Sequence, residues 1–334
     1  MRAIVLAQFG DPEKSLVLKD VPMPAPRPGY AVIKIESFGI NHAEMHMRKG
    51  EWAESMPIIG IECAGTIVSS LPADAIKPGT HVLTLMGGLG RTVNGSYAEF
   101  TSAPLTNIVP ISPSHVAKLG WARLAALPET FATAWTCLFR NLQVEPGERL
   151  LIRGATSSLG LAAVKLATHK RAVVSATSRS PEKAGELKAL GVQEVLEEGP
   201  ALADELISSG RKWDKILELV GNSTLLGSLK LVRRGGRLCL AGFLGGLDSL
   251  EFNPLLQMTS GVHFSFFGSF VFGSDEFPLS DVPLEEIVGM VANGELATEP
   301  KRIFSFGEAG VREAHRLMEA GQAGGKMVVV VNKE

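Results

Sequence analysis

The sequence predicts an α/β protein with two domains, in which a small β-barrel or sandwich precedes a parallel, doubly wound sheet. Three observations lead to this expectation. The chain has 334 residues, enough for roughly two domains of about 100–200 residues each. Short strand-like runs separated by glycine and proline fill the first third. From residue 148 onward, strand and helix patterns alternate.

The N-terminal third consists of short runs with the composition of β-strands. Residues 21–29 contain four prolines and must form an extended loop, because proline cannot donate a backbone hydrogen bond. Strands of this length, each bounded by turn residues, are typical of a barrel or sandwich. The expected strands cover residues 2–8, 30–38, 60–70, 77–85 and 95–104.

The remainder of the chain alternates between helices and strands. Residues 121–142 are expected to be helical, and strand–helix units follow them. Apolar strands alternating with helical patterns favour parallel strands that are joined by crossover helices. The expected strands cover 149–155, 172–178, 215–221, 235–243 and 327–332, and the expected helices 158–170, 181–191 and 225–232.

The charge balance argues against several classes of protein. Lys and Arg number 33 and Asp and Glu 35, so the net charge is -2 and the basic surplus of a nucleic-acid-binding protein is missing. The apolar run after Arg2 is too short for a secretory signal. The uncharged window 252–274 is interrupted by glycine, serine and proline, so we expect a buried loop and strand there and no membrane span.

The three cysteines, Cys63, Cys137 and Cys239, are far apart in the sequence. An odd number at such spacing fits neither a disulfide framework nor a clustered zinc site. We therefore expect a reducing, cytoplasmic environment, in which each cysteine is a small buried apolar residue.

The most informative stretch is 149–165, where a buried strand leads through the turn 154–160 directly into a helix. The free N–H groups of a helix N-terminus attract phosphate, and dinucleotide-binding turns usually have the pattern G-x-G-x-x-G. Here those three positions are Ala155, Ser157 and Gly160, while Thr156 and Ser158 add hydroxyl groups. The segment predicts either a dinucleotide-binding turn or an ordinary tight connection between strand and helix.

The segment after the second strand bears on the choice of cofactor. NAD-dependent enzymes place an acidic residue there to bind the adenosine ribose. This chain has Ser178, Arg179 and Lys183 instead, and Glu182 falls inside the next helix, which Ser180 and Pro181 are expected to begin. The cluster is either a solvated surface or a site for the 2′-phosphate of NADP.

Several motifs in this order resemble the medium-chain dehydrogenases/reductases, in particular the quinone oxidoreductase branch. Each motif is weak alone, but together they span nearly the whole chain. They are GINHAEMHMRKG (39–50), PIIGIECAGTIV (57–68), GSYAEF (95–100), LPETFATAW (127–135), GRLCLAGFLGG (236–246) and GGKMVVVV (324–331).

The resemblance implies a GroES-like β-barrel catalytic domain over residues 1–123. A Rossmann NADP-binding domain with a doubly wound parallel sheet would cover 124–265, and residues 266–334 would return to the catalytic domain. The cofactor would lie in the cleft between the two domains. A homodimer through the phenylalanine-rich run 263–273 is also implied, although that run could equally be a buried strand or a loop beside the nicotinamide.

The matching motifs also imply which residues contact the cofactor. Asn41 and Thr133 would approach the nicotinamide, and Asn41 could donate a hydrogen bond to a developing oxyanion or to the ribose. Thr156, Ser157, Ser158 and Leu159 would lie beside the pyrophosphate, and Gly221, Phe243, Phe267 and Lys326 are further cofactor-contacting candidates. The chain departs from the family where Ser157 and Ser158 replace the usual glycines, and where Met45 and His46 replace tyrosines of the substrate pocket.

Zinc-dependent members of the wider superfamily hold a catalytic zinc with Cys, His and Cys. Here Asn41 stands in place of the first Cys and Ile61 in place of the His, and the four-cysteine structural lobe is missing. His42 and His46 lie one helical turn apart, but such a pair lacks the third ligand of a catalytic site. We expect no metal, and we take His46 as a candidate for lining the substrate pocket.

The expected activity is NADPH-dependent, zinc-independent hydride transfer to a quinone or to an α,β-unsaturated carbonyl. The cofactor supplies the chemistry and the protein the orientation. No dedicated acid is evident, and water can protonate the product oxygen. Two alternatives are an enoyl-thioester reductase of the same fold and a structural or regulatory protein that binds NADPH without turnover.

Overall fold

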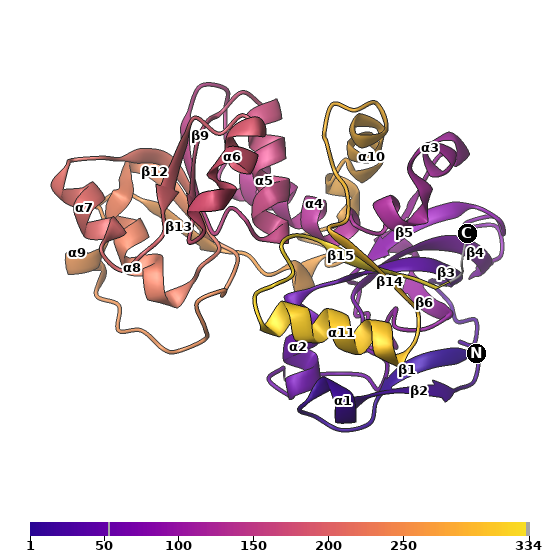
Figure 1. Ribbon diagram of the computed structural model, residues 1–334. Coiled ribbons are helices and arrows are strands. Elements are labelled where there is room, and N and C mark those ends of the chain that lie inside the picture. The colour runs from indigo at the N-terminus through magenta and orange to yellow at the C-terminus, as the bar shows by residue number, and fades with distance from the viewer. Residues whose placement is uncertain (53, 332–334) are drawn as a thin grey trace. The chain divides into compact units, whose positions relative to one another are not determined.

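The computed structural model describes residues 1–52 and 54–331. Contacts between Cα atoms divide the chain into two compact units, Met1–Ala132 with Ser269–Glu334, and Thr133–Gly268. The first unit thus extends to Ala132, beyond the expected boundary at residue 123, and α3 (Pro113–Leu124) packs against strands and a helix of that unit. The first unit is discontinuous in the sequence, and the second is continuous (Figure 1).

The long strand β3 (Tyr30–Ile40) organises the first unit. Its partners are β4 (Glu62–Leu71) on one edge, and β6 (Phe100–Pro104) and β15 (Met327–Val330) on the two halves of the other edge. The strand order is β14-β15-β3-β4-β5-β7, with β5 at His81–Leu85, β7 at Ile108–Pro110 and β14 at Arg302–Ser305. Because β15 pairs Met327 with Ile40 in antiparallel register, the residue before β15 comes to lie next to the residue after β3.

Shorter elements complete this unit. The β1–β2 ribbon (Arg2–Leu6 and Leu16–Asp20) encloses α1 (Pro12–Ser15), and α11 (Glu308–Glu319) packs against α1, α2 (His42–Lys49), β2 and β14 (Figure 1). In the core, the rings of Phe38 and Tyr97 stack with their centroids 4.9 Å apart. α10 (Leu284–Ala292) lies against α3.

The second unit is a six-stranded parallel sheet in the order β10-β9-β8-β11-β12-β13. The order reverses direction between β8 (Arg149–Arg153) and β11 (Trp213–Glu218), and such a switch point is where doubly wound sheets bind ligands. The other strands are β9 (Val173–Ser178), β10 (Glu194–Glu197), β12 (Val232–Leu240) and β13 (His263–Phe266), and the helices include α5 (Ser158–His169), α6 (Ala184–Ala189), α7 (Leu202–Ser208), α8 (Asn222–Leu231) and α9 (Pro254–Gln257).

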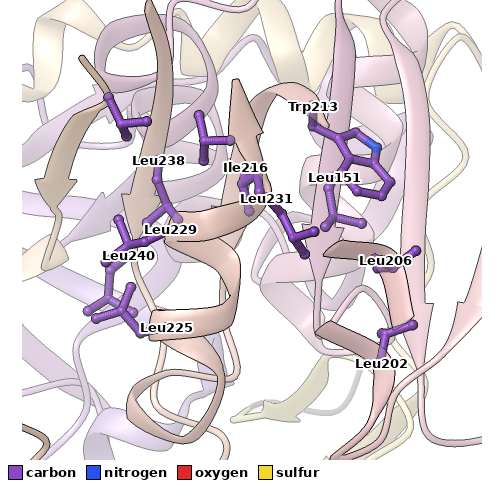
Figure 2. Packing of buried hydrophobic residues seen from close by; sticks show 12 residues of the cluster. Leu151, Leu202, Leu206, Trp213, Ile216, Leu225, Leu229, Leu231, Leu238 and Leu240 are labelled. Carbon is purple, nitrogen blue, oxygen red and sulfur yellow. The ribbon is translucent and has the colours of Figure 1, made fainter. Parts of the chain in front are cut away.

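One face of this sheet is covered by an apolar cluster (Figure 2). Leu225 and Leu229 of α8 lie against Leu238 and Leu240 of β12, and Trp213 lies near Leu151 of β8. A fully buried leucine contributes about 1.5–3 kcal/mol, so the cluster fixes α7 and α8 on the sheet. The loops at the carboxyl ends of the strands are thereby held in place.

The predicted fold class is confirmed, and most of the expected strands and helices form. The segment 121–142, expected to be helical, is helical over most of its length, but not as one continuous helix. Helix α3 already begins at Pro113, α4 (Pro128–Trp135) starts at a proline, and a π-helical segment, Thr136–Asn141, follows it. Gly120, with a φ of 68°, breaks α3.

The uncharged window 252–274 contains α9 and β13, and no helix among the described residues is long and apolar enough to cross a membrane. The helix expected at 181–191 begins as a 3₁₀ turn, Pro181–Lys183, and continues as α6. All three cysteines are buried, as expected, and none of them forms a disulfide within the described residues.

Candidate active site

Three side chains from distant parts of the first unit form a buried polar cluster. Lys326 Nζ donates to Asn41 Oδ1 and to Glu62 Oε1, and Asn41 Nδ2 donates to the same carboxylate oxygen at 2.8 Å. Glu62 is fully buried and its other oxygen accepts the backbone N–H of Glu129 at 2.7 Å. The cluster therefore pairs a buried carboxylate with one ammonium and two neutral donors.

Helix α2 begins at this cluster and is held there by Glu44. The Glu44 carboxylate accepts the backbone N–H of Asn41 at 2.7 Å and that of Ile61 at 3.1 Å. Burial, opposed by Lys326 and reinforced by Glu62, raises the pKa of Glu44 to about 7. The Glu44 carboxyl, three residues after Asn41, can therefore take up a proton near neutral pH.

Gly39 provides the space that the cluster occupies. A Cβ atom there would lie 2.2 Å from Glu62 Oε1 and 2.7 Å from Lys326 Cε, closer than packed atoms can approach. The strand conformation itself does not require glycine, because Gly39 has no positive φ. The residue is glycine so that the carboxylate and the ammonium can reach each other.

The two candidate catalytic residues, Asn41 and His46, both already have side-chain partners within the first unit. The Asn41 amide group donates to Glu62 and, at 3.3 Å, to Glu44, so both of its hydrogens already have acceptors. His46 Nδ1 contacts Glu51 Oε2, and its side chain keeps 22% of its surface exposed. Lys326, predicted only as a cofactor contact, has three N–H groups and donates two of them, to Asn41 and Glu62, which leaves one N–H for a ligand.

The turn that follows β8 has the form expected of a phosphate-binding site. Gly154 has a φ of 77° and donates to Thr177 Oγ1 at 3.1 Å. A Cβ on Gly160 would lie 2.5 Å from Gly154 O, so only glycine allows α5 to approach β8 this closely. The amides of Ser158 and Leu159 lie in the first turn of α5, where a helix supplies no acceptor.

Ser157 replaces a family glycine without strain. Its φ of -71° and ψ of 165° are ordinary extended values, and its hydroxyl caps α5 by accepting the Gly160 N–H at 3.0 Å. Thr156, Ser157, Ser158 and Leu159 all keep part of their surface exposed. The residues of the turn therefore fit a bound pyrophosphate, which would meet helix N–H groups and hydroxyls.

In the cluster after β9, Ser178 is hydrogen-bonded within the turn, whereas the side chains of Arg179 and Lys183 reach the surface. The Ser178 hydroxyl is buried in the turn, where it donates to Ser180 O at 3.1 Å and accepts the Ser180 N–H at 3.0 Å. Arg179 is exposed and Lys183 is partly exposed at the end of the 3₁₀ turn. Neither has an ion-pair partner in the part of the chain that the structure describes.

The loops after β11 and β12 approach each other at Gly221. Its φ is 101°, and a Cβ would lie 2.9 Å from Gly242 O and 3.0 Å from the Cα of Phe243. Glu218 holds this loop, since its Oε1 accepts the N–H groups of Val220 and Gly221 at 2.8 and 3.1 Å. The role of Glu218 was missed in the sequence, where it appears only as an acid at the end of an apolar strand.

Two further residues predicted to contact the cofactor, Phe267 and Thr133, are buried. Phe267 is only 3% exposed, and its backbone N–H donates to Leu240 O. Thr133 is buried within α4 and is the first residue of the second unit. For both residues the predicted cofactor contact stays a prediction.

Two family models match the chain. One, described as the alcohol dehydrogenase GroES-like domain, matches residues 27–113, and the other, described as zinc-binding dehydrogenase, matches residues 158–284. The quinone oxidoreductase of Rattus norvegicus is 32% identical over 279 residues, which cover 80% of this chain and 81% of the relative. The chain belongs to the quinone oxidoreductase branch of the medium-chain dehydrogenases/reductases.

Solved structures agree with this assignment. A quinone oxidoreductase from Pseudomonas syringae pv. Tomato DC3000 has a TM-score of 0.85 at 25% identity and covers 99% of each chain. An NAD-dependent alcohol dehydrogenase has a TM-score of 0.82 at 28% identity, with 99% and 100% of the two chains covered. The protein is accordingly an oxidoreductase of a family that uses a nicotinamide cofactor.

One of the family models has zinc in its description, which makes the residues at the metal position informative. Among residues 1–52 and 54–331, no three His, Cys, Asp or Glu side chains are grouped so that they could hold a metal ion. Asn41 and the apolar Ile61 stand at two ligand positions, and the ammonium of Lys326 contacts both Asn41 and Glu62. In this chain a lysine supplies the positive charge next to Glu62.

Proposed function

We propose that this protein is an NADPH-dependent, zinc-independent oxidoreductase that transfers a hydride to a quinone or to the β-carbon of an α,β-unsaturated carbonyl. The observation that carries the proposal is the buried Lys326–Glu62–Asn41 cluster at the family's metal position. The similarity to quinone oxidoreductases supports the substrate class.

When bound, the nicotinamide supplies the hydride. The residues of this chain bind and orient it. The first turn of α5 and the hydroxyls of Thr156 and Ser158 would hold the pyrophosphate, and Gly221 would let the neighbouring backbone come close to the cofactor. Thr133, Phe243 and Phe267 remain proposed contacts.

The choice of NADPH rests on Arg179 and Lys183. The first carboxylate after β9, Glu182, falls only within the following 3₁₀ turn, so no acid stands directly at the strand end to repel a 2′-phosphate, and Arg179 and Lys183 are available to it. Arg offers a planar fork of donors for phosphate, and Lys a point charge. Ser178 is expected to contribute mainly by shaping the turn, because its hydroxyl is already paired with Ser180.

Lys326 is the protein group best placed to act on an oxygen. Lys326 is buried, with 7% of its surface exposed, and its ammonium has one N–H beyond those donated to Asn41 and Glu62. A buried cation stabilises negative charge much more strongly than a solvated one. We therefore propose that Lys326 donates to a ligand oxygen, and that Asn41 orients Lys326 instead of donating directly.

The test is NADPH oxidation followed at the nicotinamide absorbance with 1,4-naphthoquinone, an open-chain enone and crotonyl-CoA. Turnover of the quinone or the enone supports the proposal. Turnover of the thioester alone would favour the enoyl-thioester reductase, and tight NADPH binding without turnover would favour a structural or regulatory protein.

We further propose that the protein is cytoplasmic and forms a homodimer. Strand β13 is an edge strand paired only with β12, and Phe264 and Phe266 on it are 39% and 52% exposed. An apolar sheet edge of this kind needs a covering partner. Sedimentation of the purified protein at micromolar concentration would show whether a dimer forms.

A further inference from the structure

The loop between β5 and β6 carries an arginine that the proposed reaction does not use. Arg91 lies in a tight backbone turn, in which the amides of Arg91, Thr92 and Val93 all donate to Gly88 O at 2.8–3.0 Å. Gly90 N donates to Val93 O at 2.8 Å, and Gly90 O accepts the Met56 N–H at 2.9 Å. The backbone that presents the Arg91 side chain is therefore fixed on both sides.

Two aromatic rings from distant segments flank the guanidinium. The Arg91 Cζ lies 5.4 Å from the ring centroid of Trp52 and 5.4 Å from that of Phe270. Phe270 lies in the 3₁₀ turn Ser269–Val271. Phe272, just after this turn, is held in place because its backbone carbonyl accepts a hydrogen bond from Asn107 Nδ2 at 3.2 Å. Three segments of the first unit thus converge on one cation.

The hydrogen-bonding capacity of this guanidinium is only partly used. Nη2 contacts Glu54 at 3.2 Å, but Glu54 keeps 54% of its side chain exposed, and solvent-exposed pairs of this kind are weak. Nε is buried and meets no acceptor among the described residues. Nε and Nη2 form one side of the arginine fork, the side that binds a carboxylate through two parallel hydrogen bonds.

The loop is also joined to the residues around the active-site cluster. Met86 N donates to Ile61 O at 2.8 Å, and Ile61 N in turn donates to Glu44 at 3.1 Å. A Cβ on Gly90, the residue before Arg91, would lie 3.1 Å from Gly60 N, so the loop that carries Arg91 packs on the backbone just before Glu62.

We propose that Arg91, with Trp52 and Phe270, is a specificity site that binds a carboxylate carried by the conjugated substrate, an inference that rests on the proposed function. The substrate carboxylate displaces Glu54 from Nη2 and supplies the missing acceptor at Nε. The two rings contact the flat, apolar part of the substrate. A single guanidinium matches the one charge of a carboxylate better than the nearly two charges of a phosphate monoester.

The kinetic test compares (E)-4-oxopent-2-enoate with its methyl ester, which differ in charge but share the enone. Arg91→Met keeps an apolar side chain between the rings, and it should lower kcat/KM for the acid by about ten- to a hundredfold, as expected for the loss of a charge-assisted pair, and change the ester less than about threefold. Glu54→Gln, which removes the competing carboxylate, should raise kcat/KM for the acid. Arg27→Met is the matched control, since Arg27 stacks on Tyr30 with its Cζ 3.4 Å from the ring centroid.

Equal losses for acid and ester in Arg91→Met, or no loss for either, would overturn the assignment. Calorimetric binding of 1-naphthoate and 1-naphthamide separates this result from a failure of the proposed function. If the wild type turns over neither these enones nor the quinone, the proposed function fails, and the binding data alone decide on the Arg91 site. Loss of naphthoate binding in Arg91→Met but not in Arg27→Met supports the site, and unchanged naphthoate binding refutes it.

Discussion

Replacing Lys326 by methionine tests whether the buried cluster behaves as a true ion pair. The substitution keeps a long apolar side chain but removes the only ammonium that contacts Glu62 among the described residues. Glu62 is fully buried, and its remaining donors, Asn41 Nδ2 and the Glu129 N–H, are neutral. The carboxylate would then be a buried charge without a counter-charge.

The expected cost is large. Removing one partner of a buried ion pair typically lowers the free energy of unfolding by about 3–5 kcal/mol, because the other charge stays desolvated. At roughly 2–4 °C per kcal/mol for a domain of this size, the melting temperature should fall by about 10 °C. The double variant Lys326→Met/Glu62→Gln should recover much of this loss, because it removes the stranded charge as well.

Thermal melts of the four members of the mutant cycle measure this coupling. A loss below about 1 kcal/mol, or a double variant no more stable than Lys326→Met, would refute the description of the cluster as a coupled ion pair.

Other predictions concern the cofactor, the loop and the stability. Arg179→Ala should lower kcat/KM for NADPH by about ten- to a hundredfold and leave NADH nearly unchanged, while Lys188→Ala, an exposed cation on α6, should change neither; equal effects on both cofactors would contradict the 2′-phosphate site. Gly160→Ala should abolish dinucleotide binding in equilibrium titrations, because its Cβ would lie 2.5 Å from Gly154 O. Burial, and then the charge of Arg48, lowers the pKa of His315 to about 3. This histidine therefore contributes stability above pH 6.5 that is lost as the pH falls toward 3. In His315→Gln, denaturant melts should show a free energy of unfolding that depends less on pH over that range. Elemental analysis should find far less than one zinc per chain, and activity lost to a chelator and restored by zinc would contradict the zinc-independent reaction.

Local patterns in the sequence were sufficient to predict much of the fold. These patterns each lie within a short stretch of sequence, so they can be read without knowing the tertiary structure. They are the alternation of strands and helices, the Gly154–Gly160 turn and the basic residues after β9. The boundaries of α3 and α4 were harder to predict, because the breaks come from the backbone conformation of Gly120 and from Pro128 inside a continuous apolar pattern.

The electrostatic part of the site could not be predicted in the same way. Asn41, Glu62 and Lys326 come from three motifs, and their contacts depend on the register of β15 against β3. Arg91 is a similar case, because its flanking rings come from residues 52 and 270. These side chains come together only through tertiary structure, so no local pattern in the sequence predicts their contacts.

The register also explains why the first of these motifs begins with glycine. Since Met327 pairs with Ile40, Lys326 reaches the end of β3 from one side and Glu62 on β4 from the other, and both cross the position of a Gly39 side chain. Glycine weakens a strand because it loses more conformational entropy on folding than other residues. Here the ion pair between Lys326 and Glu62 offsets that cost, and it can form only because residue 39 has no side chain. Gly39, Glu62 and Lys326 therefore form one interdependent unit, in which the lysine provides the positive charge next to Glu62.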